Sequence, residues 1–144
     1  MKVVQFIRKP GGEAFSIRQL FEDVRKELPA DIDAGLYTNP YPSRGFWRRL
    51  AGMFRAARYQ GDVNHITGDI HYLNILMRRR KTVLTVLDCI TLERLRGLKY
   101  RVFRFFWYWL PARRSAVITV ISDSTRKELQ RHLGGGSWPI VVIP

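Results

Sequence analysis

Two of the three histidines in this chain lie in one polar segment, residues 65–72, which closes an apolar run. Asp69 lies between His65 and His71. Imidazole and carboxylate groups can hydrogen-bond the hydroxyls of a substrate or move a proton near neutral pH. The spacing favours substrate binding through Thr67, Asp69 and His71 over a metal site, because carboxylates are few here and His65 falls inside the apolar run. A structural alternative stays open, in which Asp69 caps a short helix and His65 packs in the core.

A second carboxylate, Asp88, follows directly on the apolar run at residues 83–87. An ionised carboxylate beside buried residues needs solvent or a partner. Asp88 therefore either binds a substrate hydroxyl in a cleft or caps the next helical turn, and the sequence leaves both open. Cys89 is expected to be a small buried residue rather than a nucleophile. As the single cysteine, it excludes an intrachain disulfide and a cysteine-based zinc site.

Gly11 and Gly12 lie between a predicted strand and a predicted helix. Adjacent glycines let the backbone approach a phosphate closely, and the N-terminus of the next helix adds positive potential. Without a complete G-x-G-x-x-G or Walker pattern, a phosphate-facing loop and a plain turn both stay open. Ser122 follows another apolar run, residues 116–121, and is a further candidate for ligand binding.

Six short apolar runs predict the strands that position these residues. They are residues 3–7, 34–38, 63–67, 83–87, 116–121 and 140–143. Most are continuous rather than alternating, as in strands buried on both faces of a parallel sheet. Helical patterns fill the gaps, at residues 17–28, 46–54, 72–77, 98–110 and 125–133. The alternation predicts an α/β fold, a Rossmann-like parallel sheet with helices on both faces, in a single domain at residues 1–144.

In such sheets, ligands bind outside the carboxyl ends of the strands. The candidate residues lie at the ends of the first, third, fourth and fifth predicted strands and are expected to line one cleft: Gly11, Gly12, Thr67, Asp69, His71, Asp88 and Ser122.

Local signals also predict where the helices begin and end. Ser16 with Gln19, and Thr125 with Glu128, have capping-box spacing. Pro111 is expected to end the fourth helix.

The chain is strongly basic, with 25 Lys and Arg against 12 Asp and Glu and a formal net charge of +13. This balance indicates an anionic partner. The basic residues gather at residues 44–58, 78–81 and 94–114, and aromatic residues interleave the first and third blocks. Basic helices with Trp and Phe are typical of membrane-surface helices. A plain solvated face and nucleic-acid binding are alternatives, and nucleic acid is disfavoured because the aromatic residues follow one another without polar groups between them.

The composition is that of a globular protein, with 46% hydrophobic and 26% charged residues, which excludes a disordered tail or a coiled coil. No apolar stretch approaches the ~18 residues of a membrane-spanning helix. The N-terminus lacks a secretory signal. We therefore expect a cytoplasmic protein, peripheral on the inner face of a membrane if the basic helices bind lipid.

Three segments near the end of the chain carry a family resemblance. Residues 117–122 form a strand ending in Ser, residues 124–129 begin a helix, and residues 140–144 form a strand ending in Val-Ile-Pro. This succession resembles the end of the N-terminal domain in GT-B glycosyltransferases, notably glycosyltransferase family 4. The Pro-Gly-Gly of residues 10–12 resembles the family's glycine loop, and Thr-Val-Leu-Asp of residues 85–88 resembles its Thr-x-His-Asp strand end.

The resemblance implies one half of a GT-B fold and the acceptor-side domain of a retaining, metal-independent hexosyltransferase with no cofactor. It also implies a nucleotide-sugar donor and a glycan or lipid-linked acceptor. In the family, a C-terminal domain binds most of the donor. That domain is absent from this sequence, so we expect the chain to be inactive alone. An alternative is a nucleotide- or nucleic-acid-binding α/β module without catalysis.

The implied site residues fall into two groups: Gly11, Gly12 and Ser122 for donor binding, and His71, Asp69 and Asp88 as catalytic residues. Leu87 stands where many family members carry a histidine that faces the reacting sugar. This departure leaves His71 or His65 to serve instead.

Overall fold

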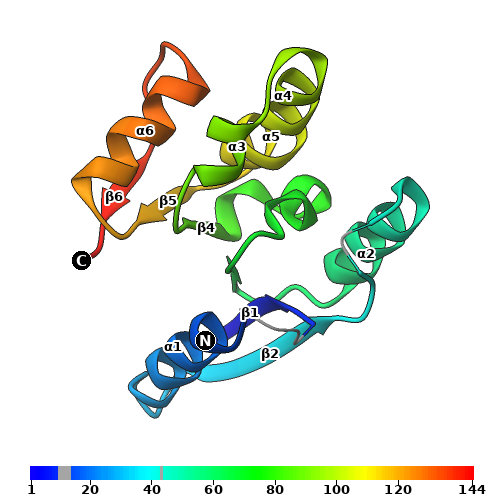
Figure 1. Ribbon diagram of the computed structural model, residues 1–144. Helices are drawn as coiled ribbons and strands as arrows, with labels where there is room; N and C mark the ends of the chain where they lie inside the picture. The colour runs from blue at the N-terminus through cyan, green and yellow to red at the C-terminus, as the bar shows by residue number, and fades with distance from the viewer. Residues whose placement is uncertain (10–13, 43) are drawn as a thin grey trace.

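The computed structural model describes residues 1–9, 14–42 and 44–144. At its centre is a six-stranded parallel sheet with the order β2-β1-β3-β4-β5-β6 (Figure 1). The strands are β1 (Lys2–Arg8), β2 (Asp33–Asn39), β3 (Val63–Ile66), β4 (Thr82–Val86), β5 (Val117–Val120) and β6 (Ile140–Val142). Each predicted apolar run coincides with a strand, so the predicted Rossmann-like α/β fold is confirmed.

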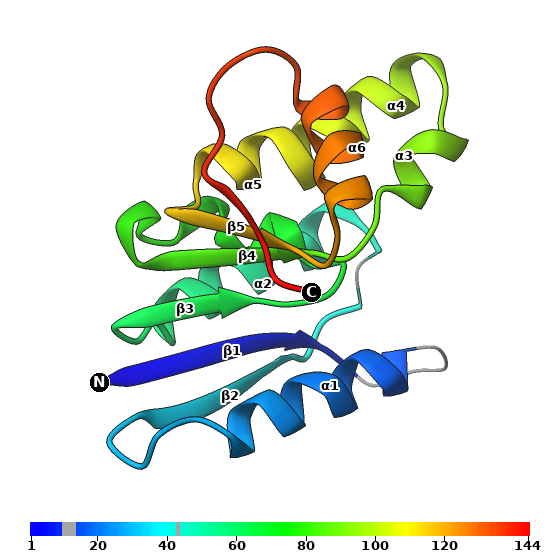
Figure 2. The same cartoon turned by 90° about the vertical axis from the view of Figure 1, so that its left-hand side faces the viewer.

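Helical segments connect the strands. They are α1 (Ala14–Lys26), α2 (Phe46–Arg58), the 3₁₀ turns η1 (His71–Leu76) and η2 (Arg79–Lys81), α3 (Ile90–Arg94), α4 (Gly97–Arg104), the π-helical turn η3 (Phe105–Trp109), α5 (Leu110–Arg113) and α6 (Asp123–Leu133). The chain steps from β1 to β2 in one direction and from β3 to β6 in the other, so right-handed crossovers place α1 and the later helices on opposite faces. Figures 1 and 2 show α1 beside β1 and β2, apart from the group formed by α3 to α6.

The main core lies between the sheet and the later helices. Phe6, Ile66, Leu84 and Ile118 are register partners on neighbouring strands, so their side chains share this face, and each is at most 1% exposed. On the opposite face, His65 Nε2 hydrogen-bonds the Thr85 hydroxyl at 2.7 Å. The two faces therefore differ: one is packed with apolar side chains, and the other carries a polar ladder.

Thr85 continues this ladder to the next strand, because its hydroxyl also hydrogen-bonds that of Thr119 at 2.7 Å. Phe21 of α1 packs its ring edge-on against His65, with the ring centroids 5.4 Å apart. His65 is thus partly buried between α1 and the sheet, which is closer to the structural alternative that the sequence left open than to a ligand-binding role.

The helix predicted to end at Pro111 instead continues to Arg113, through α4, η3 and α5. Proline has no N–H to donate to the carbonyl four residues earlier, and its ring crowds that carbonyl. Here that carbonyl belongs to Trp107, inside the π-helical turn, whose wider hydrogen-bonding pattern accommodates the proline. The predicted boundary was wrong because the helix continues past Pro111, and the Trp107 carbonyl hydrogen-bonds the His71 side chain in place of the missing N–H.

Both predicted capping boxes were also wrong. The helix α1 begins at Ala14, before Ser16. The helix α6 begins at Asp123, and its cap is Ser122, whose hydroxyl accepts a hydrogen bond from the Thr125 N–H at 3.1 Å. Ser122 has the extended backbone of an N-cap, a conformation that is incompatible with its lying inside the helix.

Candidate functional site

Polar residues gather where β1, β3, β4 and β5 end, and we call this edge of the sheet the carboxyl edge, with Arg8, Asp69, Asp88 and Ser122. The Arg8 guanidinium forms an ion pair with Asp69 at 2.8 Å between Nη1 and Oδ2, and both side chains are largely exposed. Asp88 is exposed as well. Two carboxylates and a guanidinium can therefore reach a ligand outside the strand ends.

His71 lies beneath this edge rather than on its surface. Its side chain is 3% exposed, and Nδ1 hydrogen-bonds the carbonyl of Trp107 at 2.8 Å. A carbonyl can only accept, so Nδ1 carries a proton. Burial lowers the pKa of His71, against the opposing effects of its hydrogen bonds to the backbone of Trp107 and Gly68 and of the Asp69 charge. The ring is therefore neutral at pH 7.

Side chains of the aromatic turn η3 hydrogen-bond the two loops that carry Asp69 and Asp88. The Trp107 indole N–H donates to the backbone carbonyl of Asp69 at 3.2 Å, and the Tyr108 hydroxyl donates to that of Asp88 at 3.3 Å. Tyr108 also packs edge-on against His71, with 5.1 Å between ring centroids. The ring side chains of His71, Trp107 and Tyr108 therefore fix the positions of the loops at the carboxyl edge.

Three residues of this site were not expected from the sequence: Arg8, Trp107 and Tyr108. Arg8 carried a usable signal, because it follows the first apolar run in the way that Asp88 follows the fourth. Trp107 and Tyr108 carried none, since they belong to a predicted helix far along the chain.

The polar residues expected at the edge use their side chains in different ways. Asp88 Oδ1 accepts from the Ile90 N–H at 3.1 Å, which is the capping role left open by the sequence, while the carboxylate stays exposed. Thr67 is buried and its hydroxyl donates to the Phe6 carbonyl at 3.0 Å, so it joins β3 to β1 rather than facing solvent. Asp69 makes no cap to η1 and pairs with Arg8 instead.

Gly11 and Gly12, the expected phosphate-facing residues, lie outside the described residues. Ser122 is at the edge, with its hydroxyl engaged in capping α6. Cys89 is fully buried, and burial raises its thiol pKa to about 12, so it is a poor nucleophile at neutral pH. In the part of the chain that the structure describes, no group of three or more His, Cys, Asp or Glu side chains could hold a metal ion.

A Rossmann-like parallel sheet with polar side chains gathered at the carboxyl ends of its strands defines an α/β ligand-binding domain. The chain belongs to Glycosyltransferase Family 4, whose family model matches residues 6–144. With this family match, the architecture is consistent with one half of a GT-B fold. Glycosyl transfer from a donor to an acceptor is the general activity of this family. Comparisons with curated proteins and with solved structures give no match.

Proposed function

We propose that this chain is the acceptor-binding domain of a retaining hexosyltransferase that uses a nucleotide-sugar donor. Family membership supports sugar transfer, and the exposed Asp69 and Asp88 at the carboxyl edge are the observation that carries the acceptor role. Carboxylates accept hydrogen bonds from sugar hydroxyls, and two of them on adjacent loops can fix the orientation of one ring.

In this proposal, the acceptor hydroxyl attacks the anomeric carbon of the donor while the bond from that carbon to the leaving phosphate breaks, and the hydroxyl proton passes to the leaving phosphate. Asp69 and Asp88 orient the acceptor, and His71 supports both loops from beneath. Gly11, Gly12 and Ser122 approach the donor phosphates. A second Rossmann-like domain supplies the rest of the donor site.

Saccharide binding tests the acceptor role. A glycan array with the purified chain is expected to identify at least one saccharide, whose affinity then falls at least tenfold in Asp69→Asn and in Asp88→Asn. Both changes are nearly isosteric, and in the second variant the amide oxygen of the introduced asparagine can still accept from the Ile90 N–H. Asp31→Asn is the matched control, because Asp31 is exposed and precedes β2 at the opposite edge. Binding to oligonucleotides without binding to any saccharide would favour the nucleic-acid alternative.

The need for a second domain has its own test. The chain is expected to release no nucleotide from UDP- or GDP-hexoses in the presence of the identified saccharide, because one wall of a cleft cannot position both substrates. Turnover by residues 1–144 alone would contradict a separate donor domain.

We propose further that the acceptor is lipid-linked and that the domain works on an anionic membrane surface. The helix α2 and the segment just before it carry what we call the basic aromatic surface: Arg44, Phe46, Trp47, Arg48 and Phe54. All five are exposed, with Phe46 at 67% and Trp47 at 77%. Exposed Trp and Phe beside arginine are the composition of an interfacial helix. In the described residues, no helix is long and apolar enough to cross a bilayer.

The basic aromatic surface adjoins the carboxyl edge. Arg49, in the first turn of α2, lies over the Trp107 ring, with its guanidinium carbon 4.5 Å from the ring centroid. Trp107 in turn hydrogen-bonds the backbone of Asp69. A sugar attached to a membrane lipid would therefore lie within reach of the edge while α2 rests on the bilayer.

Co-sedimentation with vesicles tests this proposal. Binding to vesicles with phosphatidylglycerol is expected to exceed binding to pure phosphatidylcholine, and Trp47→Ala with Arg48→Glu is expected to abolish the difference. Lys127→Glu, an equal charge change on the exposed side of α6, is the control and should bind almost as wild type. Equal binding to both kinds of vesicle, or to neither, would contradict the proposal.

A further inference from the structure

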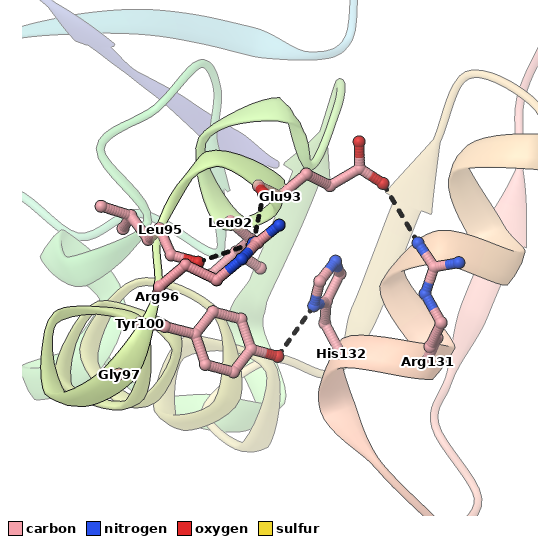
Figure 3. Close-up of a pocket in the computed structure, with 8 residues that line it drawn as sticks. All are labelled: Leu92, Glu93, Leu95, Arg96, Gly97, Tyr100, Arg131 and His132. Carbon is pink, nitrogen blue, oxygen red and sulfur yellow. Dashed lines mark hydrogen bonds and ion pairs between the residues drawn. The ribbon is translucent and has the colours of Figure 1, made fainter.

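A cavity of about 450 Å³ lies between α6 and the segment that carries α3 and the start of α4 (Figure 3). Its lining includes Arg96, Tyr100, Arg131 and His132, with Leu92 and other apolar groups between them. The cavity shares no residue with the carboxyl edge. Its volume is in the range of sites that bind small organic molecules.

One polar atom in this lining lacks a partner. His132 is only 9% exposed, and its Nδ1 hydrogen-bonds the Tyr100 hydroxyl at 2.9 Å. Its other nitrogen, Nε2, is buried without a hydrogen bond. Figure 3 shows this nitrogen directed away from Tyr100, toward the space beside Glu93 and Arg131. Buried polar atoms are nearly always paired, so an unpaired nitrogen in a cavity wall points to a ligand.

Two guanidinium groups lie at the same cavity. Arg131 Nη2 pairs with Glu93 Oε1 at 3.1 Å. Arg96 Nη1 donates to the carbonyls of Glu93 and Leu95 at 2.6 and 3.0 Å. These contacts hold the two cationic heads in place (Figure 3) and leave further N–H groups on each of them for a ligand. Two arginines and one glutamate give this cluster a net charge of +1.

The N–H donors of Arg96, Arg131 and His132 match the oxygens of a phosphomonoester. A phosphomonoester has three terminal oxygens, and arginine forms charge-assisted hydrogen bonds with such oxygens. A ligand held between Arg96 and Arg131 is rich in acceptors, so Nε2 of His132 must present a proton to it. This tautomer requires the Tyr100 hydroxyl to donate to Nδ1, and the 2.9 Å contact permits that.

Burial, reinforced by the Arg131 charge, lowers the pKa of His132. Arg104 acts in the same direction, and Glu93 and Glu128 oppose it. The ring is therefore neutral near pH 7, which is the state that the tautomer requires.

We propose that this cavity is a binding site for a small phosphomonoester, with the phosphate held by Arg96, Arg131 and Nε2–H of His132. The organic part of the ligand packs against Leu95 and the ring of Tyr100 in the cavity lining. The site is separate from the proposed sugar-transfer edge and does not depend on it.

Titration calorimetry and histidine ¹⁵N NMR on the whole chain test this site, with inorganic phosphate, phenyl phosphate and phenol as probes. Both phosphates are expected to bind saturably, phenyl phosphate at least threefold tighter, and phenol not at all. The chain has three histidines, so their ring signals can be assigned individually. The His132 ring signals should shift on binding, while those of His65 and His71 stay in place.

Arginine variants provide the second measurement. Arg96→Ala and Arg131→Ala are each expected to weaken phenyl phosphate binding at least tenfold. Arg94→Ala is the matched control, because Arg94 is exposed on α3 and does not line the cavity. Equal losses in all three variants would mean diffuse attraction to a basic protein and would overturn the proposal. So would absence of saturable binding, phenol binding as tight as phenyl phosphate, or shifts at His71 in place of His132.

Discussion

The His71 side chain owes its position to a proline far along the chain. In a regular α-helix, the carbonyl of Trp107 would accept from the N–H of residue 111, but Pro111 has none. That carbonyl accepts from His71 Nδ1 instead, at 2.8 Å, which fixes the tautomer and joins η1 to η3. Because Trp107 also holds the backbone of Asp69, His71 supports a residue of the carboxyl edge without reaching solvent itself.

The partly buried His65 predicts how the stability of the protein depends on pH. Burial lowers the pKa of His65 to about 4, against roughly 6.5 in an unfolded chain. Between these values the unfolded state binds more protons, so stability falls as pH falls and levels off below the folded pKa. Linkage gives a loss of about 2 kcal/mol from His65 between pH 7.5 and 5.

Urea denaturation of wild type and His65→Gln at these two pH values checks the effect. The variant should show a smaller pH dependence of the free energy of unfolding. The pKa of His71 and His132 is also lowered, but both residues are present in each protein, so the difference isolates His65. The same pH dependence in both proteins would contradict the prediction.

At the scale of elements, periodicity predicted every strand, because an apolar run buried in a sheet is a local property of the sequence. Helix ends were harder to predict. Ser16 and Thr125 have capping spacing, yet each lies inside its helix, and the cap of α6 is Ser122. Pro111 lies within a continuous helical segment, because a π turn precedes it. A hydrogen-bonding pattern set by tertiary contacts leaves no signal in the local spacing.

The candidate site likewise contains residues that the sequence predicted and contacts that it did not. Asp69 and Asp88 could be placed at the carboxyl edge from the sequence, because each follows a predicted strand. The hydrogen bond from the Trp107 indole to the Asp69 backbone could not be predicted, since it joins residues 38 positions apart in the sequence. The cavity at His132 could not be predicted either, because α3, α4 and α6 form it together.

The junction between α2 and β3 provides a prediction at the element scale. A Cβ on Gly61 would lie 2.7 Å from the backbone carbonyl of Lys2, where the Asp62 N–H donates to the same carbonyl at 2.8 Å. Gly61→Ala should therefore push β3 away from β1 and cost about 1–3 kcal/mol of stability. Gly135→Ala is the control, because nothing lies within 4 Å of its added Cβ. Thermal unfolding of both variants checks this, and equal melting temperatures would contradict it.

The whole molecule combines a net charge of +13 with exposed aromatic residues at the start of α2. Charge alone would attract any polyanion, so it does not distinguish lipid from nucleic acid. The proposed membrane role depends on the aromatic residues, because Trp47 and Phe46 would enter the interface of a bilayer while the arginines stay with the headgroups. The two contributions to membrane binding should respond differently to salt.

Salt dependence of vesicle binding is therefore the prediction for the molecule as a whole. Each arginine near an anionic bilayer contributes about 1 kcal/mol, and this attraction fades as the Debye length falls from ~10 Å at 0.1 M salt to ~3 Å at 1 M. Insertion of Trp47 does not depend on that length. Wild type should therefore keep part of its vesicle binding at 0.5 M salt, whereas Trp47→Ala should bind at 0.05 M and lose binding almost completely at 0.5 M. Co-sedimentation across this range measures both, and parallel salt curves for the two proteins would mean that Trp47 stays outside the bilayer.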